Sequence, residues 1–152
     1  MSENQDHADV KFHPPILALL HILGAFVVNR FLPVRLPSFP LLGGFFVIIG
    51  LILGFTAIRE FRKAHTTVDP HGSVSTVVIN GPYRFVRNPI YLGFVCLLVG
   101  FPMTFGTWWG LLLVPVFMLS MNTLVIQHEE AYLEKKFGAK YTGYKSRVGR
   151  WI

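Results

Sequence analysis

Two short blocks of this sequence carry residues suited to binding a small charged molecule. The first, NGPYRFVRNPIYLG at 80–93, places Arg84 and Arg87 just before Asn88 and Pro89, which fit the N-cap and the first position of a helix. An arginine at a helix N-terminus favours an anion such as a carboxylate, because the helix dipole is also positive there. The alternative is that the arginines only mark the boundary of the lipid headgroups.

The second block is QHEEAYLEKKFG at 127–138, in which Glu129 and Glu130 stand where apolar sequence gives way to polar sequence. The helix that carries them is predicted to end at Gly138, a typical C-terminal cap. Neighbouring helical positions point about 100° apart, so one acid can face the bundle while the other faces solvent. A basic and an acidic site side by side would suit a zwitterion such as an amino acid group.

The composition predicts that these blocks belong to an integral membrane protein. The chain has 152 residues, of which 52% are hydrophobic and 14% are charged, and its mean hydropathy is +0.49. Soluble domains usually carry about 25% charged residues. We therefore expect an all-α, polytopic membrane protein that forms a single domain over residues 1–152.

Four stretches with little or no charge are long enough to cross a bilayer as helices: 14–32, 41–58, 89–105 and 107–126. The last two are separated by a very short corner and are predicted to form a tight antiparallel helical hairpin, with a kink at Pro115. A hairpin returns its two outer ends to the same membrane surface. Arg87 and Asn88 are therefore expected near Glu129 and Glu130.

The distribution of positive charge predicts the orientation. If the polar N-terminal tail (1–13), the loop 59–88 and a C-terminal cap (127–152) lie on one side, that side holds every lysine and arginine except Arg30 and Arg35. The positive-inside rule then places both termini in the cytoplasm. The net charge of +6 is accounted for by topology and contact with anionic lipid, which argues against a nucleic-acid surface.

Other polar and small residues are interpreted as structural. His65, Asp69 and His71 lie in a loop with Pro and Gly, without helical register or a supporting cysteine, so we assign no metal site to them. Gly50 and Gly54 form a GxxxG spacing that allows two helices to approach closely.

The two blocks together resemble the isoprenylcysteine carboxyl methyltransferase family and its relatives among phospholipid methyltransferases. The resemblance rests on NGPYRFVRNPIYLG and EEAYLEKKFGAKYTGYKSRVGRW, covers about residues 60–152, and is weaker in the first two spans. It implies a membrane enzyme that uses S-adenosylmethionine in a cytoplasmic pocket covered by the C-terminal segment, without a Rossmann domain. The sequence agrees, because no glycine-rich dinucleotide fingerprint follows any predicted strand.

The resemblance also implies a set of cofactor-binding residues, drawn from the extended piece before the turn, the turn itself, the helix start and the paired acids. These are Ser75, Thr76, Val77, Val78, Tyr83, Asn88, Pro89, Ile90, Tyr91, Glu129 and Glu130. Arg87, which precedes the Asn-Pro-x-Tyr motif, is the catalytic candidate.

This sequence departs from the family pattern at two places. Asn88 stands where the eukaryotic enzymes have histidine; asparagine can donate a hydrogen bond but cannot take up a proton near neutral pH. The family's isoprenylcysteine enzymes have a basic residue about one turn before the paired acids, whereas 122–126 here contains none. The second departure argues against a prenylated cysteine carboxylate as the acceptor.

The sequence thus predicts methyl transfer from S-adenosylmethionine to a lipophilic or small acceptor (a carboxylate, thiol or amine) admitted from the membrane lipid. Arg87 would hold the cofactor carboxylate or an acceptor anion, and Glu129, with Glu130 as the alternate, the amino group or ribose hydroxyls. Tyr83 and Tyr91 would form aromatic walls. Two other hypotheses remain: a membrane reductase of sterol-reductase type using NADPH, and a non-catalytic membrane subunit.

Overall fold

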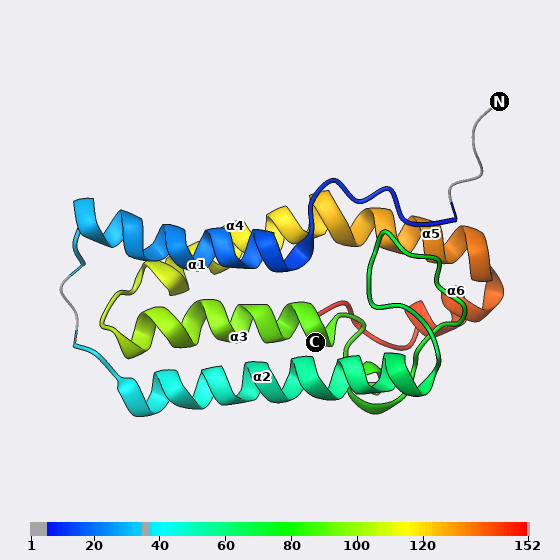
Figure 1. The fold of residues 1–152 in the computed structure, drawn as a ribbon, viewed down its shortest axis with the longest axis horizontal. Helices are drawn as coiled ribbons and strands as arrows, with labels where there is room; N and C mark the ends of the chain where they lie inside the picture. The colour runs from blue at the N-terminus through cyan, green and yellow to red at the C-terminus, as the bar shows by residue number, and fades with distance from the viewer. Residues whose placement is uncertain (1–5, 35–36, 152) are drawn as a thin grey trace.

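The computed structural model describes residues 6–34 and 37–151, and these residues form a bundle of helices with one elaborated end (Figure 1). The N-terminal residues 1–5 and Arg35, one of the two basic residues expected opposite the cytoplasm, lie outside the described residues. The helices are α1 (Pro14–Phe31), α2 (Pro40–Lys63), the 3-10 turn η1 (Gly81–Arg84), α3 (Pro89–Thr104), α4 (Trp109–Met121), the π-helical η2 (Asn122–Ile126), α5 (Gln127–Phe137) and α6 (Ala139–Lys145).

The expected all-α membrane fold is confirmed. Within the described residues the β pairing is limited to an isolated bridge between Val86 and Gly149. By length and composition α1, α2 and the continuous helix Trp109–Phe137 can cross a membrane, while α3 is a shorter apolar helix. Many of their large apolar side chains are exposed, including Leu41 and Phe55, as expected for surfaces that contact lipid chains.

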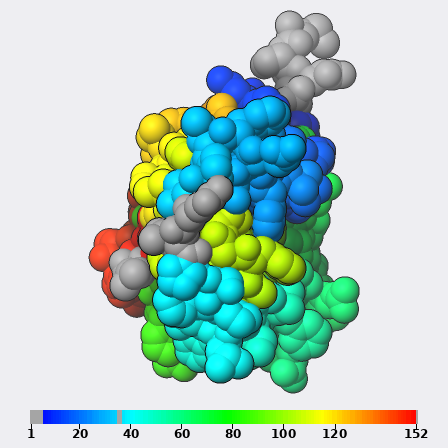
Figure 2. Space-filling view, turned by 90° about the vertical axis from the view of Figure 1, so that its left-hand side faces the viewer, coloured from blue at the N-terminus to red at the C-terminus, as the bar shows by residue number. Residues whose placement is uncertain are grey.

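The helices run parallel to one long axis, and α3 lies between α2 on one side and α1 with α4 on the other (Figure 1). At one end α1 stops, α2 starts and the corner between α3 and α4 closes the predicted hairpin (Figure 2). There the indole Nε1 of Trp109 donates a hydrogen bond to the carbonyl oxygen of Leu32 over 2.8 Å. The other end carries the loop after α2, together with α5 and α6.

Glycines bring α2 and α3 into backbone contact, and the predicted Gly50 is one of them. A Cβ added to Gly50 would lie 2.7 Å from the carbonyl oxygen of Gly93, and one added to Gly100 would lie 2.7 Å from that of Gly43. A Cβ on Gly54 would meet nothing within 4 Å. The closest approach therefore follows a seven-residue spacing on both helices. The backbone N of Gly54 lies 3.6 Å from where a Cβ of Gly93 would be, so Gly54 also packs near α3, but its own Cβ direction is open.

The N-terminal tail is less exposed than its polar sequence predicts. Ala8 and Val10 are buried in the same cluster as Phe117 and Ile126. The backbone N–H of Lys11 donates to the carbonyl oxygen of Leu124 over 3.3 Å. The tail therefore packs along the helix that carries the paired acids.

Replacing Gly50 with alanine tests the backbone contact. We expect Gly50→Ala to destabilise the protein by about 1–3 kcal/mol, because its methyl group overlaps the carbonyl of Gly93 and forces the helices apart. The matched control, Gly54→Ala, should keep or slightly raise stability, since alanine favours helix and the position is open. Thermal unfolding in one detergent compares the variants; equal midpoints for both would contradict the contact.

Candidate functional site

The loop between α2 and α3 forms one wall of the site because its own polar groups hold it in shape. The backbone N–H of Ser75 donates to Thr66 Oγ1 over 2.9 Å, and the Ser75 hydroxyl donates to the carbonyl oxygen of His65 over 3.2 Å. The chain then turns at Gly81, whose φ of +59° suits glycine. Side chains from 76–78 are thereby held inward, and Val77 and Val78 are buried.

Asn88 and Pro89 begin α3 as predicted, but Asn88 does not cap it with its side chain. Asn88 is the N-cap residue and Pro89 occupies the first turn. The Asn88 amide Nδ2 instead donates to the carbonyl oxygen of Arg150 over 3.1 Å. The capping interpretation is wrong for this side chain, because the returning C-terminal segment offers it an acceptor.

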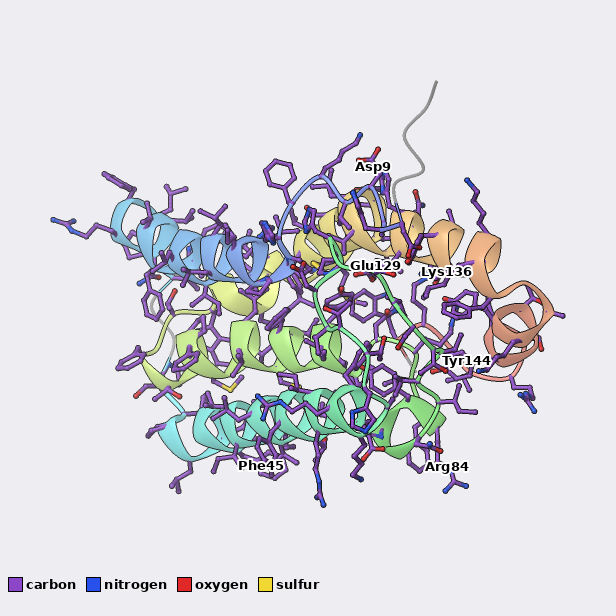
Figure 3. All side chains as sticks on the ribbon, turned by 45° about the vertical axis from the view of Figure 1, so that its right-hand side comes forward. Asp9, Phe45, Arg84, Glu129, Lys136 and Tyr144 are labelled. Atoms are coloured by element: carbon purple, nitrogen blue, oxygen red, sulfur yellow. The ribbon has the colours of Figure 1, made fainter. Side chains whose placement is uncertain are left out.

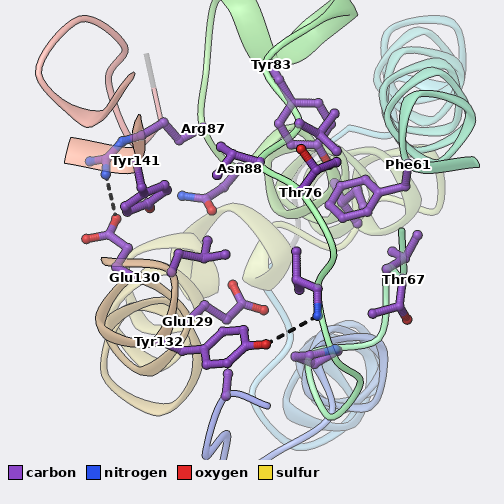
Figure 4. Close-up of a pocket in the computed structure, with 18 of the residues that line it drawn as sticks. Phe61, Thr67, Thr76, Tyr83, Arg87, Asn88, Glu129, Glu130, Tyr132 and Tyr141 are labelled. Carbon is purple, nitrogen blue, oxygen red and sulfur yellow. Dashed lines mark hydrogen bonds and ion pairs between the residues drawn. The ribbon is translucent and has the colours of Figure 1, made fainter. Parts of the chain in front are cut away.

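Glu129 and Glu130 lie in the first turn of α5, which follows the π-helical segment η2; the wider turn of η2 shifts the face that the next residues present. Their side chains point in different directions, as those of neighbouring helical positions must. Glu129 accepts a hydrogen bond from the Tyr91 hydroxyl over 2.5 Å. Glu130 turns toward Arg87 instead (Figure 4). The two acids therefore have different surroundings and different partners.

The Glu130 carboxylate is buried and is surrounded by positive groups. Arg87 Nη1 lies 2.9 Å from its Oε1, and Lys145 Nζ lies 3.2 Å from its Oε2. Arg150 binds it through both ends of the guanidinium, with Nε–Oε1 at 2.9 Å and Nη2–Oε2 at 2.8 Å. Such a fork-shaped pair is both strong and directional. This cluster joins the start of α3, the helix α5 and the C-terminal segment.

The C-terminal segment folds back over the site, as expected for a cap. The Tyr144 hydroxyl donates to the carbonyl oxygen of Tyr83 over 2.7 Å. The backbone N–H of Arg87 donates to the carbonyl oxygen of Gly149 over 2.8 Å. Burial raises the pKa of the Tyr83 and Tyr144 phenols well above the ordinary value. Both phenols therefore stay protonated at neutral pH.

Arg150 also supplies positive charge to a stretch that has none of its own. Its Nη1 donates to the Oδ1 of Asn122, the first residue of η2. Residues 122–126 contain no lysine or arginine, yet a guanidinium from near the end of the chain lies against Asn122. The C-terminal segment therefore supplies to this stretch the positive charge that its own sequence lacks.

These elements line a pocket of about 840 Å³, a volume that includes the part open to solvent. All of the expected site residues except Ser75 and Pro89 line it: Thr76, Val77, Val78, Tyr83, Arg87, Asn88, Ile90, Tyr91, Glu129 and Glu130. Figure 4 shows the two arms of the site, with Arg87 and Glu130 together on one side and Phe61 and Thr67 on the other. The Ser75 hydroxyl forms its hydrogen bond within the loop, and Pro89 is buried at the start of α3.

Several lining residues were not predicted from sequence, notably Ala8, Phe61, Tyr132 and the loop residues 67–70. Phe61 packs edge-to-face on Tyr83, with ring centroids 5.5 Å apart. Tyr132 accepts a hydrogen bond from the backbone N–H of Val74 over 3.3 Å. Phe61 continues α2 beyond its predicted end, and Tyr132 lies one helical turn after Glu129, so this spacing could have indicated it.

The tail closes one edge of the pocket through a polar cluster at the surface. Asp6 accepts a hydrogen bond from Lys136 over 2.5 Å and another from the Tyr132 hydroxyl over 3.1 Å. The hydrogen bond from Lys136 is the main cause that lowers the pKa of Asp6 to about 2. Figure 3 shows Lys136, Glu129 and Tyr144 gathered at this end of the bundle.

Comparison with known proteins identifies the family. The family model for phospholipid methyltransferase matches residues 39–140, which include both blocks of site residues. The chain belongs to the phospholipid methyltransferase family. It is also 30% identical over 125 residues to the protein-S-isoprenylcysteine O-methyltransferase of Schizosaccharomyces pombe, an alignment covering 75% of this chain and 53% of that enzyme. The chain thus spans about half the length of this relative.

A second relative of this chain is an uncharacterized protein of Haemophilus influenzae. It is 38% identical over 63 residues, covering 41% of this chain and all of that protein. No solved structure matches the chain. The family model ends at residue 140, so Tyr141, Tyr144 and Arg150 lie beyond the matched region, although they complete the pocket and its charge cluster.

Removing the charge of Glu130 should release the C-terminal segment. We expect Glu130→Gln to cost about 3–5 kcal/mol, because Arg87 and Arg150 then lose their buried counter-charge. Hydrogen exchange should show lost protection at residues 146–151. The control, Glu134→Gln, removes only a half-exposed partner of Lys145 and should leave that protection unchanged. Intact protection in Glu130→Gln would contradict the assigned role of the cluster.

Proposed function

We propose that the protein transfers a methyl group from S-adenosylmethionine to a lipophilic or small acceptor at the cytoplasmic face of the membrane. The observation that carries this proposal is the convergence of both family blocks on one pocket, where Arg87 and Glu130 are 2.9 Å apart and Glu129 lies beside them. Family membership supports the reaction class. The excess of lysine and arginine at this end of the bundle supports the cytoplasmic orientation.

The polar groups of the pocket fit the amino acid part of that cofactor. Glu129 has Tyr91 as its hydrogen-bond partner, whereas three basic side chains surround Glu130. Glu129 is therefore the acid assigned to the cofactor's amino group, and Glu130 the acid that holds the site together. Arg87 Nε is buried and has no hydrogen-bond partner among the described residues, so it can donate to a carboxylate.

The remaining walls suit the rest of the cofactor. Tyr83, Phe61 and Tyr91 offer aromatic surface, which favours a nearby positive charge such as a sulfonium. Thr76, Val77 and Val78 line the pocket from the loop after α2. When bound, S-adenosylmethionine would supply an electrophilic methyl group. The chain's own contribution would be to align an acceptor with that methyl group and to exclude water, an effect that can supply about 7–11 kcal/mol in favourable cases.

The chemistry of the pocket favours acceptors that need no strong base. Tyr83 and Tyr144 stay protonated because burial raises the pKa of both phenols, and Asn88 cannot accept a proton near neutral pH. A carboxylate or a thiolate already carries the electron pair that attacks the methyl group. An amine acceptor would have to arrive unprotonated.

Calorimetry on the detergent-purified protein distinguishes the proposal from its rivals. We expect S-adenosylhomocysteine to bind and NADPH not to bind, whereas a sterol-reductase type of enzyme would show the reverse and a non-catalytic subunit would bind neither. Glu129→Gln should weaken S-adenosylhomocysteine binding by about 10- to 150-fold, since a charged hydrogen bond contributes about 1.5–3 kcal/mol. Glu134→Gln, an acid on the same helix outside the pocket, is the control. Equal affinity in both variants would refute the assignment of Glu129.

Incubation with methyl-labelled cofactor and a membrane lipid extract identifies the acceptor class. A carboxylate acceptor gives a methyl ester, so alkali should release the label as methanol. Label on sulfur or nitrogen should survive the same treatment. We expect labelled lipid with the wild type and none with Arg87→Ala. Labelling that persists in Arg87→Ala would contradict its catalytic role.

A further inference from the structure

A second cluster of potential ligands lies where the N-terminal tail meets the loop after α2. His13 immediately precedes α1, and Asp69 and His71 are two positions apart in the loop. One ligand atom from each of the three side chains lies within 4.8 Å of the others. The rings of His13 and His71 have centroids 4.4 Å apart. In the sequence Asp69 and His71 stand near His65, and no metal site is predicted there; the structure instead places His13 beside Asp69 and His71.

The orientation of His71 leaves an acceptor atom unused. Its Nε2 lies 3.2 Å from the carbonyl oxygen of Val10, and a carbonyl can only accept, so Nε2 carries the proton. In the neutral ring Nδ1 then has a free lone pair. This Nδ1 is buried and has no hydrogen-bond partner among the described residues. It lies 3.4 Å from Asp69 Oδ1. Two lone pairs that face each other repel, and a proton or a cation between them removes the repulsion.

Hydrogen bonds within the loop hold Asp69 and His71 in place. The backbone N–H of His71 donates to Asp69 Oδ1 over 2.9 Å, and that of Asp69 donates to Thr67 Oγ1 over 3.0 Å. Zinc binds nitrogen and carboxylate oxygen at about 2.0–2.2 Å, so two of its tetrahedral ligands are about 3.4 Å apart. The separation between Asp69 Oδ1 and His71 Nδ1 is also 3.4 Å.

We propose that His13, Asp69 and His71 bind a divalent transition metal ion, for which zinc is the best match to two imidazoles and one carboxylate. Water completes the coordination, because His13 and Asp69 are exposed. The ion joins the tail that contains Ala8 to the loop 67–70, and both of these line the candidate cofactor pocket. The ion would hold the tail against the loop at the edge of that pocket.

The test uses the full chain, purified in detergent with an affinity tag that lacks histidine and is then removed. Cobalt(II), a spectroscopic substitute for zinc, is titrated while its visible absorption is followed, and zinc is then measured by competition. We expect one saturable site. His13→Ala and His71→Ala should each weaken binding by at least about tenfold, the lower limit seen for loss of even a second-shell partner. His65→Asn is the control, since asparagine tolerates the positive φ at that position.

Three results would overturn the proposal: no saturable binding by the wild type, unchanged affinity in His71→Ala, or an equal loss in His65→Asn. Far-UV circular dichroism and thermal unfolding of each variant check that it is folded. Should His71→Ala fail that check, Asp69→Asn replaces it, because amide oxygen is a far weaker zinc ligand than carboxylate.

Discussion

The buried carboxylate of Glu130 is the interaction on which the functional end of the molecule depends. A carboxylate buried without counter-charge would be costly, so it requires Arg87, Lys145 and Arg150 around it. Each of these groups comes from a different place: the start of α3, the end of α6 and the C-terminal segment. Balancing one charge thereby brings three parts of the chain to α5. The neighbouring acid, Glu129, has no basic partner in this cluster and faces the pocket.

The membrane helices determine where this charge cluster can form. Close glycine contacts between α2 and α3 align the two helices along their length, and the hairpin of α3 and α4 returns the chain to the same end. The helix then continues without interruption from α4 through η2 into α5, which carries both acids beyond the apolar spans. Packing within the apolar layer therefore sets the distance between the basic and acidic helix ends.

Much of the arrangement could be predicted from sequence because hydropathy and chain connectivity are local signals. The spans, the hairpin and the meeting of Arg87 with the paired acids follow from them. The partners of particular side chains do not. Nothing in the sequence indicates that Asn88 bonds to the backbone of Arg150 or that His13 joins Asp69. These contacts depend on how the loop and both chain ends fold back, and none of these three segments has a periodic hydrophobic pattern that would predict its position.

Arg87 and Glu130 act as one unit in the wall of the pocket. A double-mutant cycle on S-adenosylhomocysteine affinity, with Arg87→Ala, Glu130→Gln and the combined variant, tests it most directly. Residues in contact give non-additive effects. We predict that the combined variant binds no more weakly than the more severe single variant, within about twofold. Losses that multiply, or single variants that bind as tightly as the wild type, would contradict the account.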